Sequence, residues 1–358
     1  MIHGQSNKEV LLELKNFLQA QNPINHGAYI SWPESETLPC HWKGIGCDEA
    51  GHVNFLDLSN SNIAGPSFSG FSCLTRHKNF PEICGNLTFL SVSSNSFTGR
   101  IDKLFDNCPK LKHVDLSWNS FTGIVWPGIE RLRQFKANNN NLTEKISPGI
   151  FTTGFHGSVP PGIGSIAGFE ELVLASNSFD GNIPMELTNC TNLKYLDISD
   201  NNFGGEVQDV FGKLTGMRSL LLQENNYTGG ITSSGIHQLP NLIVLDLCYN
   251  QFSGDLPSEI SSMKNLKVLM LEENNFSGKI PPTYGQLLRL QVLDLSFNSL
   301  SGEIPPDIGN LSSLLLLMLA GNQISDGMPA PYSNWTSVQP KLLIRLKTII
   351  EQDSTNRS

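Results

Sequence analysis

Charged side chains are scarce in this chain, and basic ones are the scarcer kind. They make up 16% of the 358 residues, with 24 Lys and Arg against 33 Asp and Glu, for a formal net charge of −9. Only residues 341–347 gather several basic residues. Because nucleic acids and anionic membranes attract basic surfaces, this balance disfavours both as the main partner.

Long apolar runs are also missing. The longest, LLLLMLA at residues 314–320, falls far short of the roughly 18 to 20 residues that a membrane-spanning helix needs. The first residues carry charges at Lys8, Glu9, Glu13 and Lys15, so they offer no apolar core for a secretory signal. We therefore expect neither a membrane span nor an export signal within this chain.

Catalytic and metal-binding patterns are a third absence. The eight His residues are scattered, and only His41 and His113 stand near distinctive residues. No set of nucleophile, base and orienting group is recognisable, and no motif for a metal or cofactor occurs. The sequence predicts a protein that is not an enzyme and needs no cofactor.

What the chain has in abundance is repetition. The pattern L-x-x-L-x-L-x-x-N-x-L recurs, as in LKVLMLEENNF from residue 266 and LQVLDLSFNSL from residue 290. From Asn177 onward the motif Asn returns every 24 residues, with one step of 25, which predicts a solenoid of stacked repeats. The motif Asn residues are Asn95, Asn119, Asn140, Asn177, Asn201, Asn225, Asn250, Asn274, Asn298 and Asn322.

Each repeat predicts one short strand, followed by a turn and a short return segment. Alternate side chains of the L-x-L core enter a shared interior, so neighbouring strands form one parallel sheet on the inner, concave face of a right-handed α/β solenoid. A buried Asn is costly unless its amide is satisfied, so we expect the Asn column to bind the backbone of adjoining turns. Gly and Pro after each Asn, as in residues 301–311, permit the turn and the return.

The chain divides into a non-repeat segment at 1–50, an array of about 11 to 12 repeats at 51–328 and a tail at 329–358. Two stretches, 66–86 and 141–155, break the register. Thr153 stands where a motif Asn is expected, so about half a repeat, its strand included, is missing there. Such an array must distort or leave a backbone edge unpaired.

Both ends predict amphipathic helices. Near the N-terminus, Ser6 and Glu9 form a capping-box pattern before an apolar face that would cover the open end of the core. A second helix is expected from Pro340, either covering the last repeat or belonging to an unfolded tail; a membrane-surface helix is less favoured. The apolar faces comprise Leu11, Leu14, Phe17 and Leu18, and Leu342, Leu346, Ile349 and Ile350.

Two of the seven cysteines, Cys40 and Cys47, precede the first repeat in LPCHWKGIGC. Zinc usually needs two close ligand pairs at tighter spacing, and only His41 is near. A redox C-x-x-C is excluded by the spacing. A disulfide that closes a small loop is the best interpretation, and it indicates an oxidising, secreted setting.

The other cysteines are predicted to be thiols. Cys84, Cys108 and Cys190 share one column of the repeat with aliphatic residues, so we expect buried thiols that act as small hydrophobic side chains. Cys248 is expected on an outward strand position as a free thiol. Cys73 lies in an irregular stretch and has no assigned place.

The motifs now identify a resemblance. The segment SWPESETLPCHWKGIGC resembles the N-terminal cap of plant leucine-rich repeat proteins, and LQVLDLSFNSLSGEIPPDIGNL at 290–311 resembles their plant-type repeat of 24 residues. The similarity covers residues 5–328 and is strongest to the extracellular half of plant leucine-rich repeat receptor-like serine/threonine kinases, in the subgroup related to the brassinosteroid receptor. The cap residues that match are Trp32, Pro39, Cys40, Trp42, Gly44 and Cys47.

The resemblance implies ligand recognition at the outer face of the plasma membrane or in the apoplast, in signalling or defence. A peptide or small molecule is the implied ligand, and another leucine-rich repeat protein is the implied co-receptor. No kinase motif and no steroid-binding insertion occurs in this chain. A secreted inhibitor similar to polygalacturonase-inhibiting proteins is an alternative, although no Cys follows Cys248; a truncated, non-functional product is another.

Seven internal N-x-[ST] sequons agree with a secreted protein. They are Asn86, Asn141, Asn189, Asn226, Asn275, Asn310 and Asn334. Glycans are expected away from the binding face.

Solenoids bind ligands on the concave sheet, where outward strand residues of successive repeats make one surface. Aromatic residues beside carboxylates there would suit a ligand with a positive charge and an apolar part. Trp118 and Phe297 stand out because large aromatic residues are unusual on an exposed sheet. The candidates are Trp118, Tyr195, Asp200, Glu224, Tyr249, Glu272, Glu273 and Phe297; the column of Asp57, Asp115, Asp197, Asp246 and Asp294 is interpreted as structural.

Overall fold

The computed structural model describes most of the repeat array and its N-terminal cap. The described residues are 7–22, 27–36, 38–65, 84–101, 108–123, 131–145, 168–182, 185–207 and 210–325. They belong to two compact units, Met1–Phe179 and Asp180–Ser358, here called unit 1 and unit 2. Among the described helices, none combines the length and apolar character that crossing a bilayer requires. The predicted tail helix from Pro340, Asn334, Thr153 and Cys73 lie outside the described residues.

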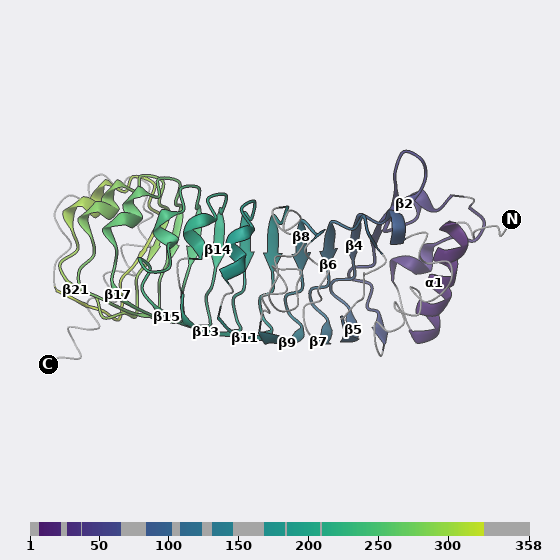
Figure 1. Ribbon diagram of the computed structural model, residues 1–358, viewed down its shortest axis with the longest axis horizontal. Coiled ribbons are helices and arrows are strands. Elements are labelled where there is room, and N and C mark those ends of the chain that lie inside the picture. The colour runs from purple at the N-terminus through teal and green to yellow at the C-terminus, as the bar shows by residue number, and fades with distance from the viewer. Residues whose placement is uncertain are drawn as a thin grey trace. The chain divides into compact units, whose positions relative to one another are not determined.

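Unit 1 begins with the cap (Figure 1). Helix α1, Asn7–Gln21, buries Val10, Leu11, Leu14 and Leu18, which confirms the predicted apolar face except that Phe17 is only half-buried. The 3₁₀ helices η1, Ala28–Ser31, and η2, Pro39–His41, lead into β1, Ile45–Cys47, which runs antiparallel to β2, Val53–Asp57.

The sheet of unit 1 then continues in parallel, one strand per repeat. Its registers place Leu56, Leu90, Val114, Phe135 and Leu172 side by side in the core. The strands after β2 are β4, Phe89–Ser91; β6, His113–Asp115; β8, Gln134–Lys136; and β10, Glu171–Val173. The second strands of the repeats are β3, Ala64–Gly65; β5, Ser96–Arg100; β7, Ser120–Gly123; and β9, Asn141–Lys145. Strand β11, Ser178–Gly181, lies at the boundary of the two units.

Unit 2 repeats the same plan with greater regularity. Its main strands, in sheet order, are β12, Tyr195–Asp197; β14, Ser219–Leu221; β16, Val244–Asp246; β18, Val268–Met270; β20, Val292–Asp294; and β22, Leu316–Met318. The second strands are β13, Asn202–Glu206; β15, Asn226–Gly229; β17, Gln251–Asp255; β19, Asn275–Ser277; β21, Ser301–Gly302; and β23, Gln323–Ile324. The predicted α/β solenoid with a parallel sheet is confirmed.

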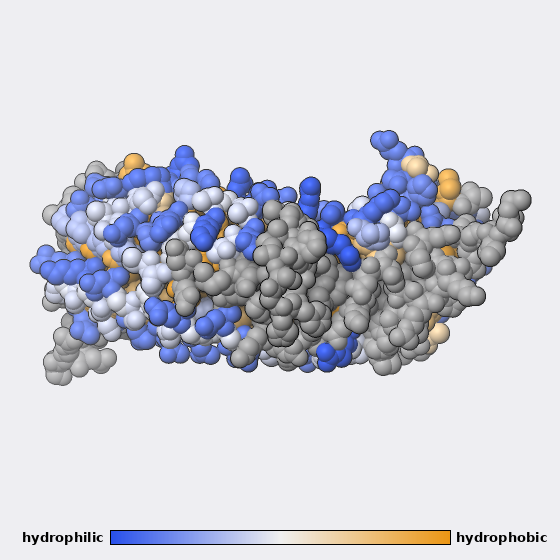
Figure 2. All heavy atoms as spheres, viewed as in Figure 1, coloured by the Kyte–Doolittle hydropathy of each residue, from blue (hydrophilic) through white to orange (hydrophobic). Residues whose placement is uncertain are grey.

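The return segments of unit 2 are short 3₁₀ helices. Pro257, Pro281 and Pro305 cap η8, η9 and η10, because the proline ring fixes a φ angle compatible with a helix start. Their bounds are η5, Met185–Asn189; η6, Phe211–Lys213; η7, Ile236–Gln238; η8, Ser258–Ser262; η9, Pro282–Gln286; and η10, Pro306–Asn310. On the face drawn in Figure 2 the described residues are largely hydrophilic, and apolar residues appear there as separate spots.

The Asn column forms the predicted ladder. Asn225 donates from Nδ2 to the carbonyls of Ile198, Leu222 and Gln223 at 3.0, 3.2 and 3.1 Å. Its Oδ1 accepts from the backbone N–H of Phe203 at 3.0 Å. One side-chain amide thus connects its own turn to the preceding repeat. The same kinds of contact are made by Asn95, Asn119, Asn140, Asn177, Asn250, Asn274, Asn298 and Asn322.

Of the two outcomes expected near Asn140, a distortion or an unpaired backbone edge, the second does not occur at β8. Strand β10 pairs directly with β8, although the irregular stretch lies between them in the sequence. Leu142 N–H donates to Asn177 Oδ1 at 3.0 Å, and Asn177 Nδ2 donates to Ala137 O at 2.9 Å. The next complete repeat supplies both the partner strand and the Asn amide, so the backbone edge of β8 is satisfied. Strands β2 and β4 pair in the same way across residues 66–83.

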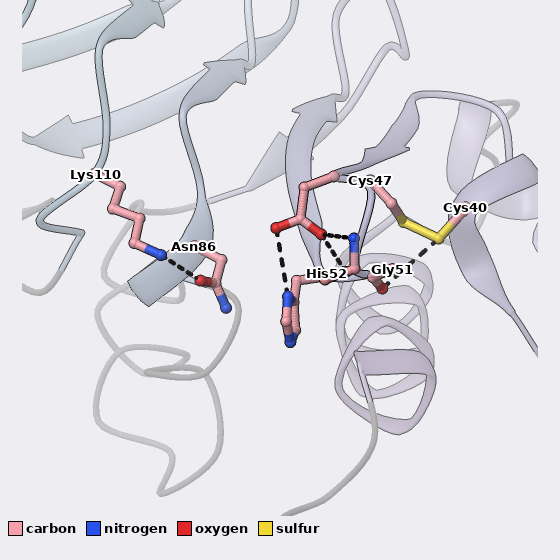
Figure 3. A network of polar contacts seen from close by, with 8 residues as sticks. Cys40, Cys47, Gly51, His52, Asn86 and Lys110 are labelled. Carbon is pink, nitrogen blue, oxygen red and sulfur yellow. Dashed lines mark hydrogen bonds and ion pairs between the residues drawn. A yellow bond between two sulfur atoms is a disulfide. The ribbon is translucent and has the colours of Figure 1, made fainter.

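The structure joins Cys40 to Cys47, with their Cα atoms 5.4 Å apart, beside an Asp48–His52 contact in the same loop (Figure 3). It also joins Cys84 to Cys108, so the prediction of two free thiols was wrong. Both residues are buried as expected, but adjacent repeats bring this shared column to a Cα separation of 4.5 Å, which is within disulfide range.

The remaining two described cysteines are free. Cys190 is buried as predicted, and burial raises the pKa of its thiol to about 12. Cys248 was expected to face outward, yet it is only 3% exposed. It follows β16 in the turn that the next repeat covers, where Tyr249 N–H donates to Glu272 O at 2.9 Å.

Candidate recognition surface

The solvent side of the unit 2 sheet is built by the residues that flank each core Leu. Side chains alternate along a strand, so Leu196, Leu220 and Leu245 enter the core while their neighbours face the other way. The first outward column consists of Tyr195, Ser219, Val244, Val268, Val292 and Leu316. The third strand position holds Asp197, Leu221, Asp246, Met270, Asp294 and Met318.

Seven of the eight candidate residues lie beyond the strands, which corrects their predicted placement. Only Tyr195 is a strand residue, and Glu272 stands two residues after β18. The other six occupy the position immediately before the motif Asn, which we call the turn column. They have φ angles between 49° and 56°, and they are Trp118, Asp200, Glu224, Tyr249, Glu273 and Phe297.

The turn column lies where the chain turns from the main strand of a repeat into its second strand, and its residues adopt the left-handed conformation there. Its backbone N–H groups bond to the next repeat, as when Glu224 N–H donates to Cys248 O at 2.9 Å. For residues other than Gly this conformation costs about 1 to 2 kcal/mol each, which the regular hydrogen bonding of the array offsets. The fold thus lifts this column out of the sheet and toward solvent.

Three large aromatic side chains in the turn column are exposed to solvent. Trp118 in unit 1 is 59% exposed, and Tyr249 and Phe297 in unit 2 are 50% and 48% exposed. The Phe297 ring lies over Gly321, where a Cβ atom would come within 2.5 Å of Phe297 Cδ1. A glycine in the turn column of the following repeat therefore leaves room for this ring.

Carboxylates surround Tyr249. The Tyr249 hydroxyl donates to Glu272 Oε1 at 3.5 Å, and the negative charge of Glu272, with that of Glu273, raises the pKa of Tyr249. Partial burial, followed by the charges of Asp294 and Glu273, raises the pKa of Glu272. Within the described part of the chain, no Lys or Arg forms an ion pair with Glu224, Glu272 or Glu273. The group therefore presents negative charge that no basic side chain offsets at contact distance.

The column of Asp residues has a structural role, in agreement with its interpretation from the sequence. Asp197 Oδ1 accepts from Ser199 N–H at 3.2 Å and from Ser199 Oγ at 2.6 Å, and Asp246 accepts from Cys248 N–H at 3.1 Å. These bonds close the turn after each strand. Burial is the main cause that raises the pKa of Asp197 and of Asp246.

Four of the sequon asparagines stand exposed. They are Asn141, Asn226 and Asn275, each directly after a motif Asn, and Asn310 at the end of η10. Asn86 and Asn189 are half-buried, and Asn86 Oδ1 accepts from Lys110 Nζ at 2.8 Å (Figure 3).

Sequence reasoning missed one row on the sheet of unit 1. Strand register places Phe55, Phe89, His113 and Gln134 side by side on the solvent side of β2, β4, β6 and β8. The irregular spacing between the first two repeats obscured this row in the sequence. The row could have been found by aligning the residue that precedes the second Leu of each motif, because this residue is Phe55, Phe89, His113 or Gln134. Among the described residues, no cluster of three or more His, Cys, Asp or Glu is arranged to hold a metal ion.

Family models match the chain from the cap to the last regular repeats. A leucine rich repeat N-terminal domain matches residues 5–48, and leucine rich repeat models match 86–108, 110–132, 189–206, 240–283 and 289–311. All of the matched segments are cap or repeat segments.

Relatives and solved structures agree with these matches. The chain is 38% identical over 209 residues to a probable LRR receptor-like serine/threonine-protein kinase of Arabidopsis thaliana, covering 41% of this chain and 19% of that protein. It is 32% identical over 160 residues to a brassinosteroid LRR receptor kinase of Oryza sativa subsp. japonica, covering 37% and 13%. The chain thus matches only a small part of the length of these relatives.

A similar solved structure is the Arabidopsis receptor kinase HAESA in complex with the peptide hormone IDA and the co-receptor SERK1. The TM-score is 0.77 at 27% sequence identity, and the superposition covers 93% of this chain and 53% of the other. The chain therefore carries leucine-rich repeats behind a leucine-rich repeat N-terminal domain, and its similarity is to the extracellular domains of plant leucine-rich repeat receptor-like kinases.

Proposed function

We propose that this chain recognises an extracellular ligand without catalysing a reaction, as the ligand-binding part of a plant receptor-like kinase or as a kinase-less fragment of one. The observation that carries the proposal is the group on unit 2 in which Tyr249 stands beside Glu272 and Glu273. An aromatic side chain that is half exposed and carboxylates without basic partners are unusual for a surface that serves only the fold.

The chemistry of this group defines the ligand. A cationic side chain, Arg or Lys, would pair with Glu272 and Glu273, and its aliphatic stem or a neighbouring apolar residue would contact the Tyr249 ring. Phe297 offers a second apolar contact in unit 2, and Glu224 and Asp200 add negative charge along the turn column. A peptide or small molecule with positive charge and an apolar part is therefore the proposed ligand class.

The known complexes support a peptide ligand and a co-receptor. HAESA binds the peptide hormone IDA together with SERK1, and this chain shares its fold. By this analogy we place the chain at the outer face of the plasma membrane or in the apoplast, in cell-surface signalling or defence. A co-receptor with leucine-rich repeats is the proposed protein partner. The Cys40–Cys47 disulfide agrees with an oxidising, extracellular setting.

Selection from a random peptide library tests the proposal. The full chain, expressed behind a secretory leader, should enrich peptides in which Arg or Lys stands near an apolar residue. A Glu272→Gln/Glu273→Gln variant should lose this enrichment, because the amides keep the side-chain shape but remove the charge.

Glu303→Gln/Glu259→Gln is the matched control, since it removes two exposed carboxylates of unit 2 outside the turn column. Its selected peptides should resemble those of the wild type. Enrichment without basic residues, or the same enrichment with the Glu272→Gln/Glu273→Gln variant, contradicts the proposal.

A further inference from the structure

The sheet of unit 1 carries a row of flat side chains that the proposed recognition surface does not use. Phe55 of β2 lies beside Phe89 of β4, and Phe89 lies beside His113 of β6. All three are half-buried on the side of the sheet away from the core residues Leu56, Leu90 and Val114. We call these three residues the ring row.

The rings of this row stand on edge. Phe55 and Phe89 stack with their centroids 4.3 Å apart and their planes within 10° of parallel. Their faces are turned toward each other along the sheet, so solvent meets their rims. The His113 ring follows at 6.5 Å from Phe89 with a tilt of 34°. The row thus presents aromatic rims on three consecutive strands.

Both ends of the row are fixed by contacts. Gly46 of β1 pairs with Phe55, and a Cβ atom at Gly46 would lie 2.9 Å from Phe55 Cβ. Only glycine at this position therefore avoids a clash with the Phe55 side chain. At the other end His113 Nδ1 lies 2.8 Å from Gln134 Oε1. Because a carbonyl oxygen can only accept, His113 Nδ1 donates this bond, and the bond sets the orientation of the imidazole.

The charge distribution of the exposed ring rims determines which kinds of ligand the row attracts. The rim of an aromatic ring is electropositive and its face electronegative, so a row of rims attracts either an anion or the face of another ring. Asp57 and Asp115 occupy the third positions of β2 and β6 on the same side of the sheet. Their charges repel an anion and leave a neutral ring as the better ligand.

We propose that the ring row binds the flat face of a neutral aromatic group, such as the indole or phenol side chain of a peptide. The rims of Phe55, Phe89 and His113 contact that face in the edge-to-face geometry that aromatic pairs prefer. This binding site does not depend on the proposed recognition surface, because its residues belong to unit 1 and its probe carries no positive charge.

Saturation-transfer difference NMR with the full chain tests the ring row. The probes are N-acetyl-tryptophanamide and, as the aliphatic control, N-acetyl-leucinamide. The wild type should transfer saturation to the indole protons in a saturable way, and the leucine amide should receive much less at equal concentration. In Phe89→Leu, which keeps an apolar side chain but removes the rim, the Kd for the indole probe should rise about 2- to 10-fold.

Leu38→Ala is the matched control, because it removes an exposed apolar side chain of the same unit outside the row. It should leave the Kd unchanged. Thermal melting by circular dichroism checks the fold, and His113→Ala replaces Phe89→Leu as the test variant if the latter melts earlier than the wild type. Equal saturation of both probes, an unchanged Kd in the test variant, or a loss of binding in Leu38→Ala would overturn the proposal.

Discussion

At the residue scale, the motif Asn is the clearest case of a side chain that the fold requires. Asn250 donates to the carbonyls of Leu222, Leu247 and Cys248 and accepts from the N–H of Tyr227, all within 3.2 Å. No other common side chain offers two donors and one acceptor in so small a volume. The column could therefore be predicted from the sequence, because a polar residue that recurs at a buried position must be satisfied.

Replacing Asn250 by Ala should leave these backbone groups buried without partners. We expect a loss of about 2 to 4 kcal/mol of unfolding free energy, since each unsatisfied buried group costs about 1 to 3 kcal/mol and the groups relax together. Urea denaturation measures it. The adjacent, exposed Gln251 is the control: Gln251→Ala should change stability by less than about 0.5 kcal/mol. Equal effects of the two changes would contradict the ladder.

Asp246 is expected to make stability depend on pH. Burial, with the charges of Asp197 and Asp294, raises the pKa of this carboxyl above its ordinary value of 3.8 in the folded chain. The folded state therefore binds the proton more tightly than the unfolded state, and Asp246 destabilises the fold increasingly as pH rises above about 3.8 until it passes the folded pKa.

Asp246→Asn should consequently raise the melting temperature at pH 7, because the amide oxygen can still accept from Cys248 N–H while the buried charge is gone. At pH values below 3.8 the carboxyl of Asp246 is protonated in both the folded and the unfolded state, so the difference in melting temperature between the variant and the wild type should disappear. A larger benefit of the variant in acid than at pH 7 would contradict a raised pKa of Asp246 in the folded chain.

At the element scale, strands could be predicted better than turns. The L-x-L core marks each strand, but the residues after it carry no common signature: Trp118, Tyr249 and Phe297 all adopt a left-handed conformation that none of them favours. Their exposure was expected, yet their place beyond the strand was not. The backbone hydrogen bonds to the next repeat decide this conformation, and they involve no side chain that a sequence pattern could reveal.

The direct pairing of β8 with β10 predicts that residues 146–167, which lie between β9 and β10 in the sequence, are dispensable for the array. We expect that replacing residues 146–167 by LPSEISSMK, the sequence of residues 256–264, would create a repeat of regular length and keep the fold. The shorter connection should add about 0.5 to 1 kcal/mol through a smaller loop-closure cost. Circular dichroism melting of both proteins measures the effect, and loss of the cooperative transition would contradict it.

At the scale of the whole molecule, the repeat class followed from periodicity alone, because a one-dimensional array repeats one set of contacts. Contacts across repeats were harder to foresee. Cys84 and Cys108 were recognised as one buried column, but their distance depends on how closely two rungs stack. Phe55 and Phe89 were not recognised as neighbours, because 34 residues separate them where regular repeats have 24.

Exposure of the sequons predicts where glycans would attach in the secreted chain. We expect high occupancy at Asn226 and Asn275, whose side chains are exposed, and lower occupancy at Asn86 and Asn189, which are half-buried. Glycopeptide mass spectrometry before and after enzymatic deglycosylation measures each site. Full occupancy at Asn86 with none at Asn226 would contradict the exposure pattern.

The central claim, that unit 2 recognises a cationic and apolar ligand through Glu272, Glu273 and Tyr249, is tested most directly by one equilibrium measurement. A peptide selected by the wild type is titrated against the wild type and the Glu272→Gln/Glu273→Gln variant. The account predicts a Kd at least about 10-fold higher for the variant, because hydrogen bonds to charged groups contribute about 1.5 to 3 kcal/mol. A Kd within twofold of the wild type would contradict it.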